Sequence, residues 1–383
     1  TRLEKAEAER LLQMEAERMT QSLFTKAELD TEMTVVRNEF ESGENNPYLV
    51  LWKRLQAVAF DWHNYGNLPI GARSDIENVP FGNLRAFYQR YYQPDNAVLI
   101  VAGKFDPAAT LELVAAHFGA IPRPTRPLPQ LYTAEPVQDG ERMVTVRRPG
   151  GNQLVAALYR IPQGAHPDFI ALKALARIMT IQPSGRLYRA LVDTKKATEV
   201  DSSVLDLHDP GTLVFWVQVP TAEPLDVAQG ALLATIAGVA DDPITAAEVD
   251  RVRIRALKSF DDTINDPQRL GVALSESIAA GDWRLLFLQR DRWRALQAAD
   301  VQRAAKTWLK PANLTIGRFV PEAQPDRTPA AADVDVAALF RDYRGDAAVA
   351  AGETFDATPA NLEARTRRVT LPGGMKLALL PKK

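Results

Sequence analysis

The sequence contains one short pattern twice, and this repeat limits the possible folds more than any other feature. Residues 84–104 (LRAFYQRYYQPDNAVLIVAGK) read as a helix, a Pro-Asp-Asn turn and an apolar strand that ends at Gly103. Residues 301–320 (VQRAAKTWLKPANLTIGRFV) read as the same three elements around a Pro-Ala-Asn turn. Proline after a helix is common, but the order, the turn and the strand all recur. The sequence therefore predicts two copies of one α/β unit.

The chain is long enough for more than one domain, because its 383 residues exceed what one compact core usually holds. A proline-rich stretch at 121–131 (IPRPTRPLPQL) predicts an extended linker between the copies. The elements expected after it are strands at 142–146, 153–159 and 212–219, a helix at about 167–180, and helices beginning near Thr245 and Pro267. Hairpin strands beside helices predict an α+β domain with a mainly antiparallel sheet.

The last part of the chain changes in character. Residues 321–361 are rich in Ala, Asp and Pro without periodicity, which predicts a long linker. Residues 368–380 (RVTLPGGMKLALL) then read as strand, turn and strand, like the opening of the second copy. The chain begins inside a charged helix without an initiating methionine and stops after this hairpin. We interpret both ends as cuts within a longer protein, so the absence of a signal peptide says little about the compartment.

Composition excludes several functional classes. A net charge of −2 favours neither nucleic acid nor an anionic membrane as the main partner. No apolar run is long enough to span a bilayer. The absence of cysteine rules out disulfides, thiolate metal sites and cysteine nucleophiles. The 46% of apolar and 25% of charged residues are ordinary for a soluble globular protein.

The clearest candidate site is a pair of carboxylates, Glu32 and Glu39, within residues 25–43 (TKAELDTEMTVVRNEFESG). Thr25 and Glu28 form a predicted capping box at the start of a helix. The helix has an apolar stripe made of Leu29, Met33, Val36 and Phe40. Two helical turns bring position i+7 back over position i, so both glutamates project from one face. Two carboxylates beside apolar residues are well placed only if a cation or a partner protein binds them. The alternative is that they lie on a solvated helix face without a function.

These residues resemble the segment that follows the catalytic motif of the M16 (pitrilysin/insulinase-like) zinc metallopeptidases. The resemblance rests on an ordered set of positions that covers essentially the whole chain. The set is Glu17-Arg18-Met19, Phe24, Leu29, Glu32, Val35-Val36, Glu39, Ala59-Phe60, His63, Gly71, Ile76, Tyr91, Pro94, Asn96, Val98–Gly103, Ser184-Gly185-Arg186-Leu187, Pro311 and Asn313.

The resemblance implies an α+β fold with two homologous M16-type (LuxS/MPP-like) domains, in which a mainly antiparallel sheet is packed with helices. On this basis we divide the chain into five parts. They are the C-terminal part of a first M16 domain with the zinc-glutamate helix (1–120), a proline-rich linker (121–140), a second M16-type domain (141–320), an inter-half linker (321–362) and the first hairpin of a third domain (363–383).

The resemblance also implies a zinc site. Members of the family hold Zn²⁺ with an H-x-x-E-H motif and a downstream glutamate, and the glutamate of the motif is the general base. By position, Glu39 matches the third zinc ligand, and Glu32 matches an upstream acidic residue that orients a histidine ligand.

This sequence departs from the family pattern because it has no H-x-x-E-H motif. Its only histidines are His63, His117, His166 and His208. We therefore expect both histidine ligands and the general base upstream of residue 1, and we predict that this chain alone neither binds zinc tightly nor hydrolyses peptides. His63 is interpreted as a structural loop residue in preference to a ligand of a different metal site, and the other three histidines receive no role.

Other polar and glycine positions have plain interpretations. Glu41 and Glu44 are predicted to face solvent. Gly71, Gly103 and Gly317 are interpreted as residues that backbone geometry requires.

A second family feature is an Arg/Tyr pair that holds the substrate carbonyl. Alignment through Arg186-Leu187 and Leu191 puts Val192 at the arginine position and Glu199 at the tyrosine position. This copy thus lacks the pair, as expected for an N-terminal half whose pair would lie beyond residue 383.

The leading hypothesis is that the chain is part of a zinc metalloendopeptidase that encloses peptides or unfolded polypeptides in a clamshell chamber. Its partners would be the missing N- and C-terminal M16 domains, and edge-strand addition would contribute to peptide recognition. The resemblance favours a periplasmic location. The alternatives are a non-catalytic M16-like partner or scaffold subunit, and an unrelated α+β binding protein.

Overall fold

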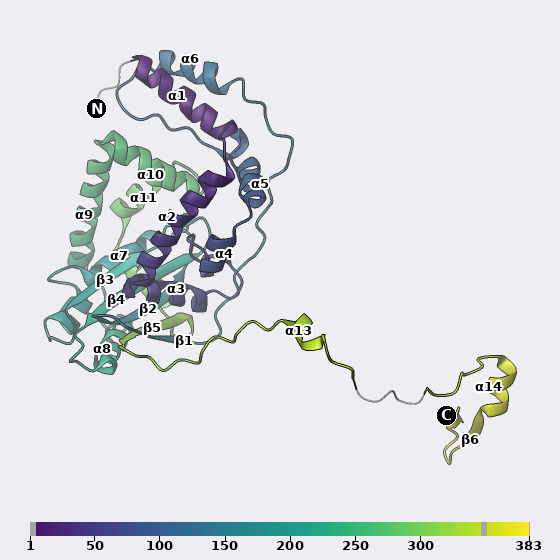
Figure 1. The fold of residues 1–383 in the computed structure, drawn as a ribbon. Helices are drawn as coiled ribbons and strands as arrows, with labels where there is room; N and C mark the ends of the chain where they lie inside the picture. The colour runs from purple at the N-terminus through teal and green to yellow at the C-terminus, as the bar shows by residue number, and fades with distance from the viewer. Residues whose placement is uncertain (1–4, 346–350, 383) are drawn as a thin grey trace. The chain divides into compact units, whose positions relative to one another are not determined.

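The computed structural model describes residues 5–345 and 351–382, which form two compact units divided between Pro325 and Asp326 (Figure 1). No helix in these two ranges is long and apolar enough to cross a membrane. The helices of the first unit are α1 (Lys5–Thr20), α2 (Lys26–Glu44), α3 (Pro47–Ala59), α4 (Arg73–Asn78), α5 (Phe81–Tyr91), α6 (Pro107–Phe118), α7 (Phe169–Thr180), α8 (Leu225–Gly238), α9 (Ala246–Ile264), α10 (Pro267–Ala279), α11 (Leu285–Ala295) and α12 (Ala298–Trp308). Short helical turns are η1 (Asn64–Gly66), η2 (Pro94–Asn96), η3 (Tyr188–Val192) and η4 (Pro311–Asn313).

One five-stranded sheet organises the first unit. Its strands are β1 (Arg142–Arg148), β2 (Gln153–Ile161), β3 (Glu199–Val204), β4 (Gly211–Val219) and β5 (Leu314–Pro321). Their order is β1-β5-β2-β4-β3, in which only the β1–β5 pair is parallel. The structure thus confirms an α+β fold with a mainly antiparallel sheet packed with helices.

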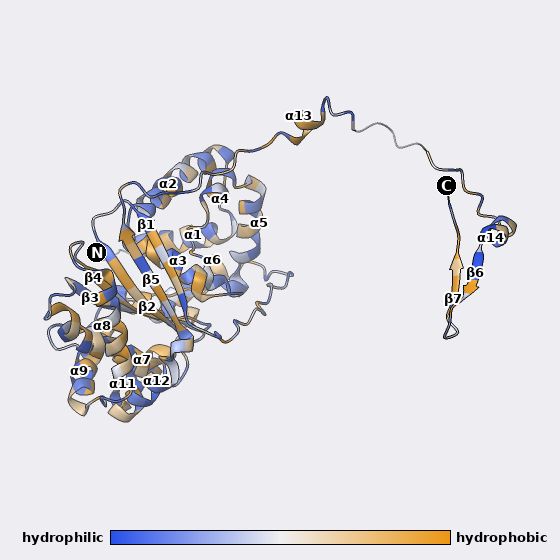
Figure 2. Ribbon diagram, turned by 90° about the horizontal axis from the view of Figure 1, so that it is seen from below, coloured by the Kyte–Doolittle hydropathy of each residue, from blue (hydrophilic) through white to orange (hydrophobic). Residues whose placement is uncertain are grey.

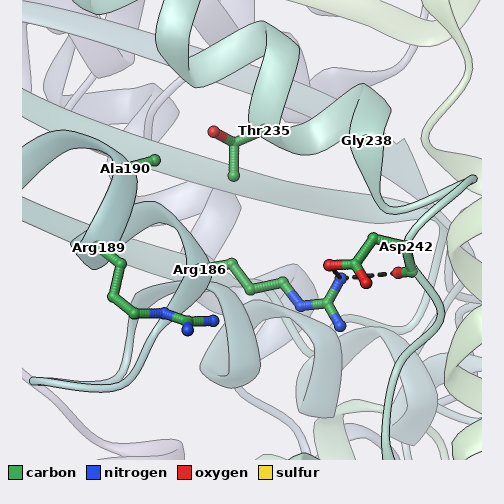
Figure 3. A pocket seen from close by; sticks show the side chains of 6 residues that line it. All are labelled: Arg186, Arg189, Ala190, Thr235, Gly238 and Asp242. Carbon is green, nitrogen blue, oxygen red and sulfur yellow. Dashed lines mark hydrogen bonds and ion pairs between the residues drawn. The ribbon is translucent and has the colours of Figure 1, made fainter.

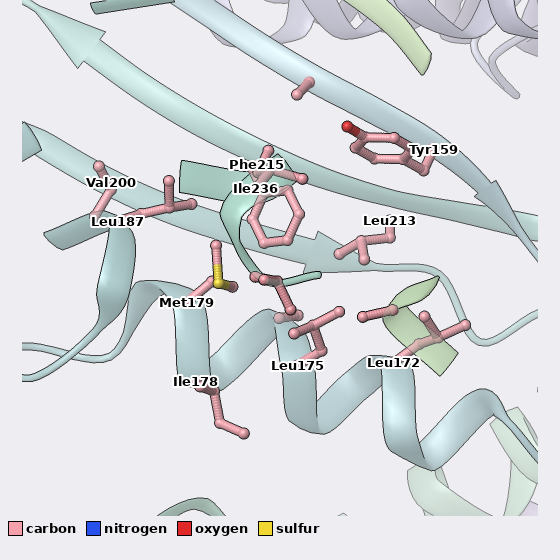
Figure 4. Close-up of a cluster of buried hydrophobic side chains, with 14 of the residues drawn as sticks. Tyr159, Leu172, Leu175, Ile178, Met179, Leu187, Val200, Leu213, Phe215 and Ile236 are labelled. Carbon is pink, nitrogen blue, oxygen red and sulfur yellow. The ribbon is translucent and has the colours of Figure 1, made fainter. Parts of the chain in front are cut away.

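Both faces of the sheet are covered, and the register of β2 separates the two cores. Val155, Ala157 and Tyr159 face the larger cluster, which α7, α8, α9 and α12 complete. Figure 4 shows Leu172, Leu175 and Met179 of α7 pointing toward Leu213 and Phe215 of β4. Because side chains alternate along a strand, the residues between them face the opposite side. Every residue of β2 is therefore buried, which explains its unbroken apolar sequence.

The opposite face of the sheet is covered by α3. Leu51 and Leu55 of α3 are fully buried against Leu154, Ala156 and Phe319 of the sheet. Figure 2 shows orange, hydrophobic segments and blue, hydrophilic ones among the strands of this sheet. The α3 helix belongs to the part of the chain that precedes the proline-rich stretch, so this contact joins the two parts of the first unit.

The repeated turn has the same local structure in both copies. The side-chain amide of Asn96 donates to the carbonyl of Tyr91 at 3.0 Å, and that of Asn313 donates to the carbonyl of Trp308 at 2.7 Å. Each asparagine thus satisfies a carbonyl at the end of the preceding helix, which explains the recurrent Pro-x-Asn. The assignment of the copies to two homologous domains stays a prediction.

One expected strand is absent. Residues 97–103 form no strand and have no strand partner within the described residues, whereas the matching residues after Asn313 form β5. The prediction of a strand here was wrong for this chain, because a strand exists only through hydrogen bonds to a neighbouring strand. Val98, Leu99 and Val101 are accordingly 40–63% exposed.

Most of the other expected elements are present, including the capped helices that begin after Thr25 and Thr245. Several elements were not predicted from the sequence, namely α4, α6, α8, α11, β3, α13 (Val336–Phe340) and α14 (Pro359–Arg365). The α8 sequence is apolar on every side, and β3 (EVDSSV) is too polar for a period-two pattern.

The second unit contains two short helices and a hairpin. These are α13 (Val336–Phe340), α14 (Pro359–Arg365), β6 (Arg367–Thr370) and β7 (Lys376–Leu379). The hairpin turns at Gly373 and Gly374, whose φ angles are 106° and 86°. The hairpin was expected from the sequence, and its membership of a third domain stays a prediction.

Candidate functional site

The α2 helix that carries the glutamate pair begins at the predicted capping box. The Thr25 hydroxyl accepts from the Glu28 N–H at 3.2 Å, and the Glu28 carboxylate accepts from the Thr25 N–H at 2.9 Å. These hydrogen bonds from Thr25 lower the pKa of Glu28. Two of the backbone N–H groups at the start of α2 are thus satisfied, as a capping box requires.

The apolar stripe of α2 packs as the sequence indicates. Leu29 is buried, whereas Met33, Val36 and Phe40 are half-buried. The Nζ atom of Lys53 on α3 lies 4.6 Å from the centre of the Phe40 ring. The stripe therefore orients α2 and leaves its other faces in solvent.

Both Glu32 and Glu39 are exposed on α2, and neither has an ion pair or side-chain hydrogen bond within the described residues. Seven residues correspond to about 10 Å along a helix, so the two carboxylates lie two turns apart beside the apolar stripe. Two exposed carboxylates on one helix are available to a cation or to another chain. Their predicted roles in a zinc site stay predictions.

The C-terminal end of α2 is fixed to the sheet through Glu44. Its carboxylate lies 2.7 Å from the Arg148 guanidinium at the end of β1 and 3.5 Å from Lys53 Nζ. Burial by itself raises the pKa of Glu44, but the hydrogen bonds and charges of Arg148 and Lys53 outweigh burial and lower it. The prediction that Glu44 faces solvent was therefore wrong, since sequence gives no sign of Arg148 nearby. Glu41 is exposed and lies 3.6 Å from Arg73.

The histidines of the chain do not surround Glu39. His63 is held in the loop after α3, where its Nδ1 accepts from the Tyr65 N–H at 3.2 Å and its Nε2 lies 3.3 Å from Asp209 Oδ2. This is the structural use expected of it. Within the residues that the structure describes, no group of three or more His, Asp or Glu side chains could hold a metal ion.

The donors present fit a partial zinc site. An exposed carboxylate such as that of Glu39 is a suitable oxygen ligand for Zn²⁺, but a protein site needs three ligands. The other two would have to come from outside the residues that the structure describes.

A second connection joins the loop after α3 to the sheet. Glu135, within the stretch expected to be a linker, lies 2.6 Å from Arg160 of β2, and their side chains are 7% and 9% exposed. Glu135 also accepts from the backbone N–H groups of residues 61, 62 and 63. Burial raises the pKa of Glu135, but these three donors and Arg160 outweigh it, so the pKa is lowered. Sequence reasoning missed this pair, whose partners are far apart in the chain.

The Ser184-Gly185-Arg186-Leu187 segment has a structural role, because Arg186 links it to α9. Arg186 binds both carboxylate oxygens of Glu248 at 2.8 and 2.9 Å and donates to the carbonyl of Asp242 at 2.8 Å. Figure 3 shows Arg186 extending toward Asp242 in a pocket of about 400 Å³, with Arg189 on its other side. The Nε, Nη1 and Nη2 atoms of Arg186 all donate hydrogen bonds, and these bonds connect the turn before η3 to the start of α9. Val192 ends η3, and Glu199 begins β3.

Glu248→Gln is expected to lower the free energy of unfolding by about 2 kcal/mol at neutral pH. Burial by itself raises the pKa of Glu248, but hydrogen bonds from Arg186 and Thr245 lower it from 4.5 to about 2. A carboxylate whose pKa is lowered on folding stabilises the fold above its unfolded pKa. Its contribution is then lost as the pH falls from about 4.5 toward 2.

Urea unfolding of both proteins over this pH range measures the effect. Glu276→Gln, which alters an exposed carboxylate on α10, is the control and should behave like the parent protein. A difference between Glu248→Gln and the parent that is constant with pH would contradict the expectation.

Comparison with known proteins defines the class of this fold. Residues 78–255 match the family profile described as the Peptidase M16 inactive domain. The zinc protease PqqE of Helicobacter pylori is 27% identical over 309 residues, which are 80% of this chain and 70% of that protein. A crystal structure of a protease from Helicobacter pylori superposes with a TM-score of 0.79 at 26% identity, over 83% of this chain and 77% of that chain. This chain belongs to the M16 peptidase family.

More distant members share the fold. The first half of the periplasmic protease PqqL of Escherichia coli has a TM-score of 0.65 at 20% identity, over 83% of this chain and 71% of that chain. Against the longer PqqL structure, this chain covers 43%. It covers 50% of an uncharacterized zinc protease of Mycobacterium leprae, at 26% identity.

Proposed function

We propose that this chain is part of a zinc-dependent endopeptidase and supplies Glu39 as the third zinc ligand. The observation that carries the proposal is the state of Glu39, which is exposed on a helix anchored at its end and has no partner within the described residues. Membership of the M16 family supports the choice of zinc. Zinc bound there would polarise a peptide carbonyl and acidify a water molecule.

The residues of this chain would act by holding and orienting. Glu39 would give one carboxylate oxygen to the metal, and Glu32, two turns earlier, would receive the N–H of a histidine ligand and fix its ring. The capping box, the apolar stripe and the Glu44–Arg148 pair would keep both carboxylates in place. The H-x-x-E-H motif, with both histidines and the general base, would precede residue 1.

The substrate proposed is a peptide or unfolded polypeptide enclosed between this half and further M16 domains. The likeness to the first half of PqqL supports the arrangement in halves and a periplasmic location.

In a protein extended at its N-terminus to include the upstream motif, Glu39→Gln is expected to weaken zinc binding by about 100-fold or more and to abolish peptide hydrolysis. Competition with a metal chelator measures the affinity, and a quenched fluorescent peptide measures hydrolysis. Glu41→Gln, on the same exposed helix, is the matched control and should bind zinc normally. Unchanged zinc affinity of Glu39→Gln would refute the ligand assignment.

A second candidate is a non-catalytic partner or scaffold subunit. It is favoured by the match of residues 78–255 to a domain described as inactive. The residues encoded upstream of Thr1 decide between the two. An intact H-x-x-E-H supports the peptidase, whereas a degenerate motif supports the scaffold.

A further inference from the structure

A groove of about 650 Å³ lies between α7, α9 and the edge strand β3, and the site described above does not use it. Because β3 is the last strand of the sheet, no further strand covers this side. Val200, Val252 and Trp293 line the groove and are at most 8% exposed, so its floor is apolar and well packed.

Three cations line one wall of the groove. Lys173 and Arg177 come from α7, where a spacing of four residues places them on the same face. Arg255 comes from α9, so two helices direct positive charge into one space. All other residues between Phe169 and Thr180 are buried. Lys173 and Arg177 therefore form the polar face of α7.

These cations have little compensation from within the chain. The Lys173 Nζ atom lies 4.0 Å from Asp206, whose other contact is a 2.9 Å hydrogen bond from Gln289. The side chains of Arg177 and Arg255 have no hydrogen bond or ion pair within the described residues. Arg186 in the same unit differs, because its Nε and Nη2 atoms both donate to the carboxylate of Glu248.

The electrostatics of Lys173 agree with an excess of positive charge. Burial lowers the pKa of Lys173, Asp206 opposes this effect, and the nearby charge of Arg177 lowers the pKa further. Like charges that repel one another gain most when an anion enters between them.

Two carboxylates of β3, Glu199 and Asp201, also line the groove. Val200, which lies between them, is buried in the cluster that α7 completes, and the Ser202 hydroxyl donates to the carbonyl of Ala176 on α7. Because side chains alternate along a strand, Glu199 and Asp201 point to the opposite sheet face, together with Ser203, whose hydroxyl accepts from Trp216 in the cluster that α3 covers. The wall formed by the helices is therefore the place for an anion.

We propose that this groove binds a carboxylate group of a peptide, held by Arg177 and Arg255 with Lys173 beside them. A planar guanidinium group binds a carboxylate with two hydrogen bonds. The apolar floor of the groove can pack against the aliphatic part of the ligand residue that carries the carboxylate. The carboxylate can belong to an acidic side chain or to a peptide C-terminus. That the ligand is a peptide rests on the proposed function, whereas the site itself requires neither zinc nor hydrolysis.

The test uses the full chain without zinc and three fluorescently labelled peptides derived from one neutral parent sequence. One has two internal glutamates and an amidated C-terminus, one has a free C-terminal carboxylate, and one is neutral and amidated. Binding is measured by fluorescence anisotropy. We expect at least one acidic peptide to bind more tightly than the neutral one, with an affinity that falls as salt is raised.

The double variant Arg177→Gln/Arg255→Gln is expected to weaken binding of that peptide about 20-fold, and each single variant about 5-fold. Both side chains are exposed, so the melting temperature should stay close to that of the parent. Arg189→Gln removes an exposed arginine that lines the pocket beside Arg186, and it should not affect binding. Which acidic peptide loses affinity identifies the source of the carboxylate. Unchanged affinity for both, or equal binding of the neutral peptide, would overturn the proposal.

Because these assays require no metal, their failure leaves the zinc proposal intact. Conversely, loss of the Glu39 assignment would leave the anion site in place.

Discussion

Replacing Glu135 with alanine is expected to lower the free energy of unfolding of the first unit by about 3–5 kcal/mol. The change leaves the Arg160 guanidinium, whose side chain is 9% exposed, without its counter-charge. It also removes the acceptor for three successive N–H groups in the loop after α3. Each buried polar group without a partner costs free energy. Urea unfolding followed by tryptophan fluorescence measures the loss.

Two variants control this prediction. Asp30→Asn breaks an exposed pair with Lys26, in which the side chains are 61% and 74% exposed, and should cost less than about 0.5 kcal/mol. The double variant Glu135→Ala/Arg160→Met should be less destabilised than Glu135→Ala alone, because it leaves no unpaired buried charge. If Glu135→Ala costs no more than Asp30→Asn, the pair does not hold the loop.

Gly317→Val in β5 is expected to destabilise the first unit by about 3 kcal/mol, although valine ordinarily favours strands. A Cβ atom at Gly317 would lie 2.8 Å from Cγ and Cδ2 of Leu55 on α3. Leu55 is fully buried and cannot move aside without displacing α3 from the sheet. The expected loss reflects this close approach of helix to strand. Thermal or urea unfolding measures it.

Shortening the opposing side chain tests the cause. Leu55→Ala should relieve part of the cost of Gly317→Val, so the two changes together should cost less than their sum. Gly230→Ala is the control, because nothing lies within 4 Å of its Cβ position on α8. It should stabilise the protein by about 0.5–1 kcal/mol. Strict additivity of the Gly317 and Leu55 changes would mean that the clash is not the cause.

The sequence predicted elements where local signals are strong. The capping boxes at Thr25 and Thr245 mark helix starts because their hydrogen bonds lie within one turn. The strand expected at 97–103 failed because its pairing depends on a remote segment. Of the glycines, Gly71 and Gly103 have positive φ angles of 76° and 141°, as backbone geometry predicts. Gly317 is instead required by the closeness of Leu55.

Some features of the candidate site could likewise be predicted from the sequence, and others could not. The helical spacing of Glu32 and Glu39 placed both carboxylates on one exposed side of α2, and the resemblance suggested what they bind. That Glu44 binds Arg148 could not be predicted, because 104 residues separate them. Nor could the groove cations be grouped from sequence, since Lys173 and Arg255 belong to different helices.

The sequence by itself determined the family, the α+β class, most helices and the face on which the glutamate pair lies, because these depend on local spacing and on the order of motifs. Only the tertiary structure decided how α2 is anchored, why Gly317 must be glycine, and which cations meet beside β3. These contacts join residues far apart in the chain, and their free energies come from burial and charge pairing that arise only when the helices pack on the sheet.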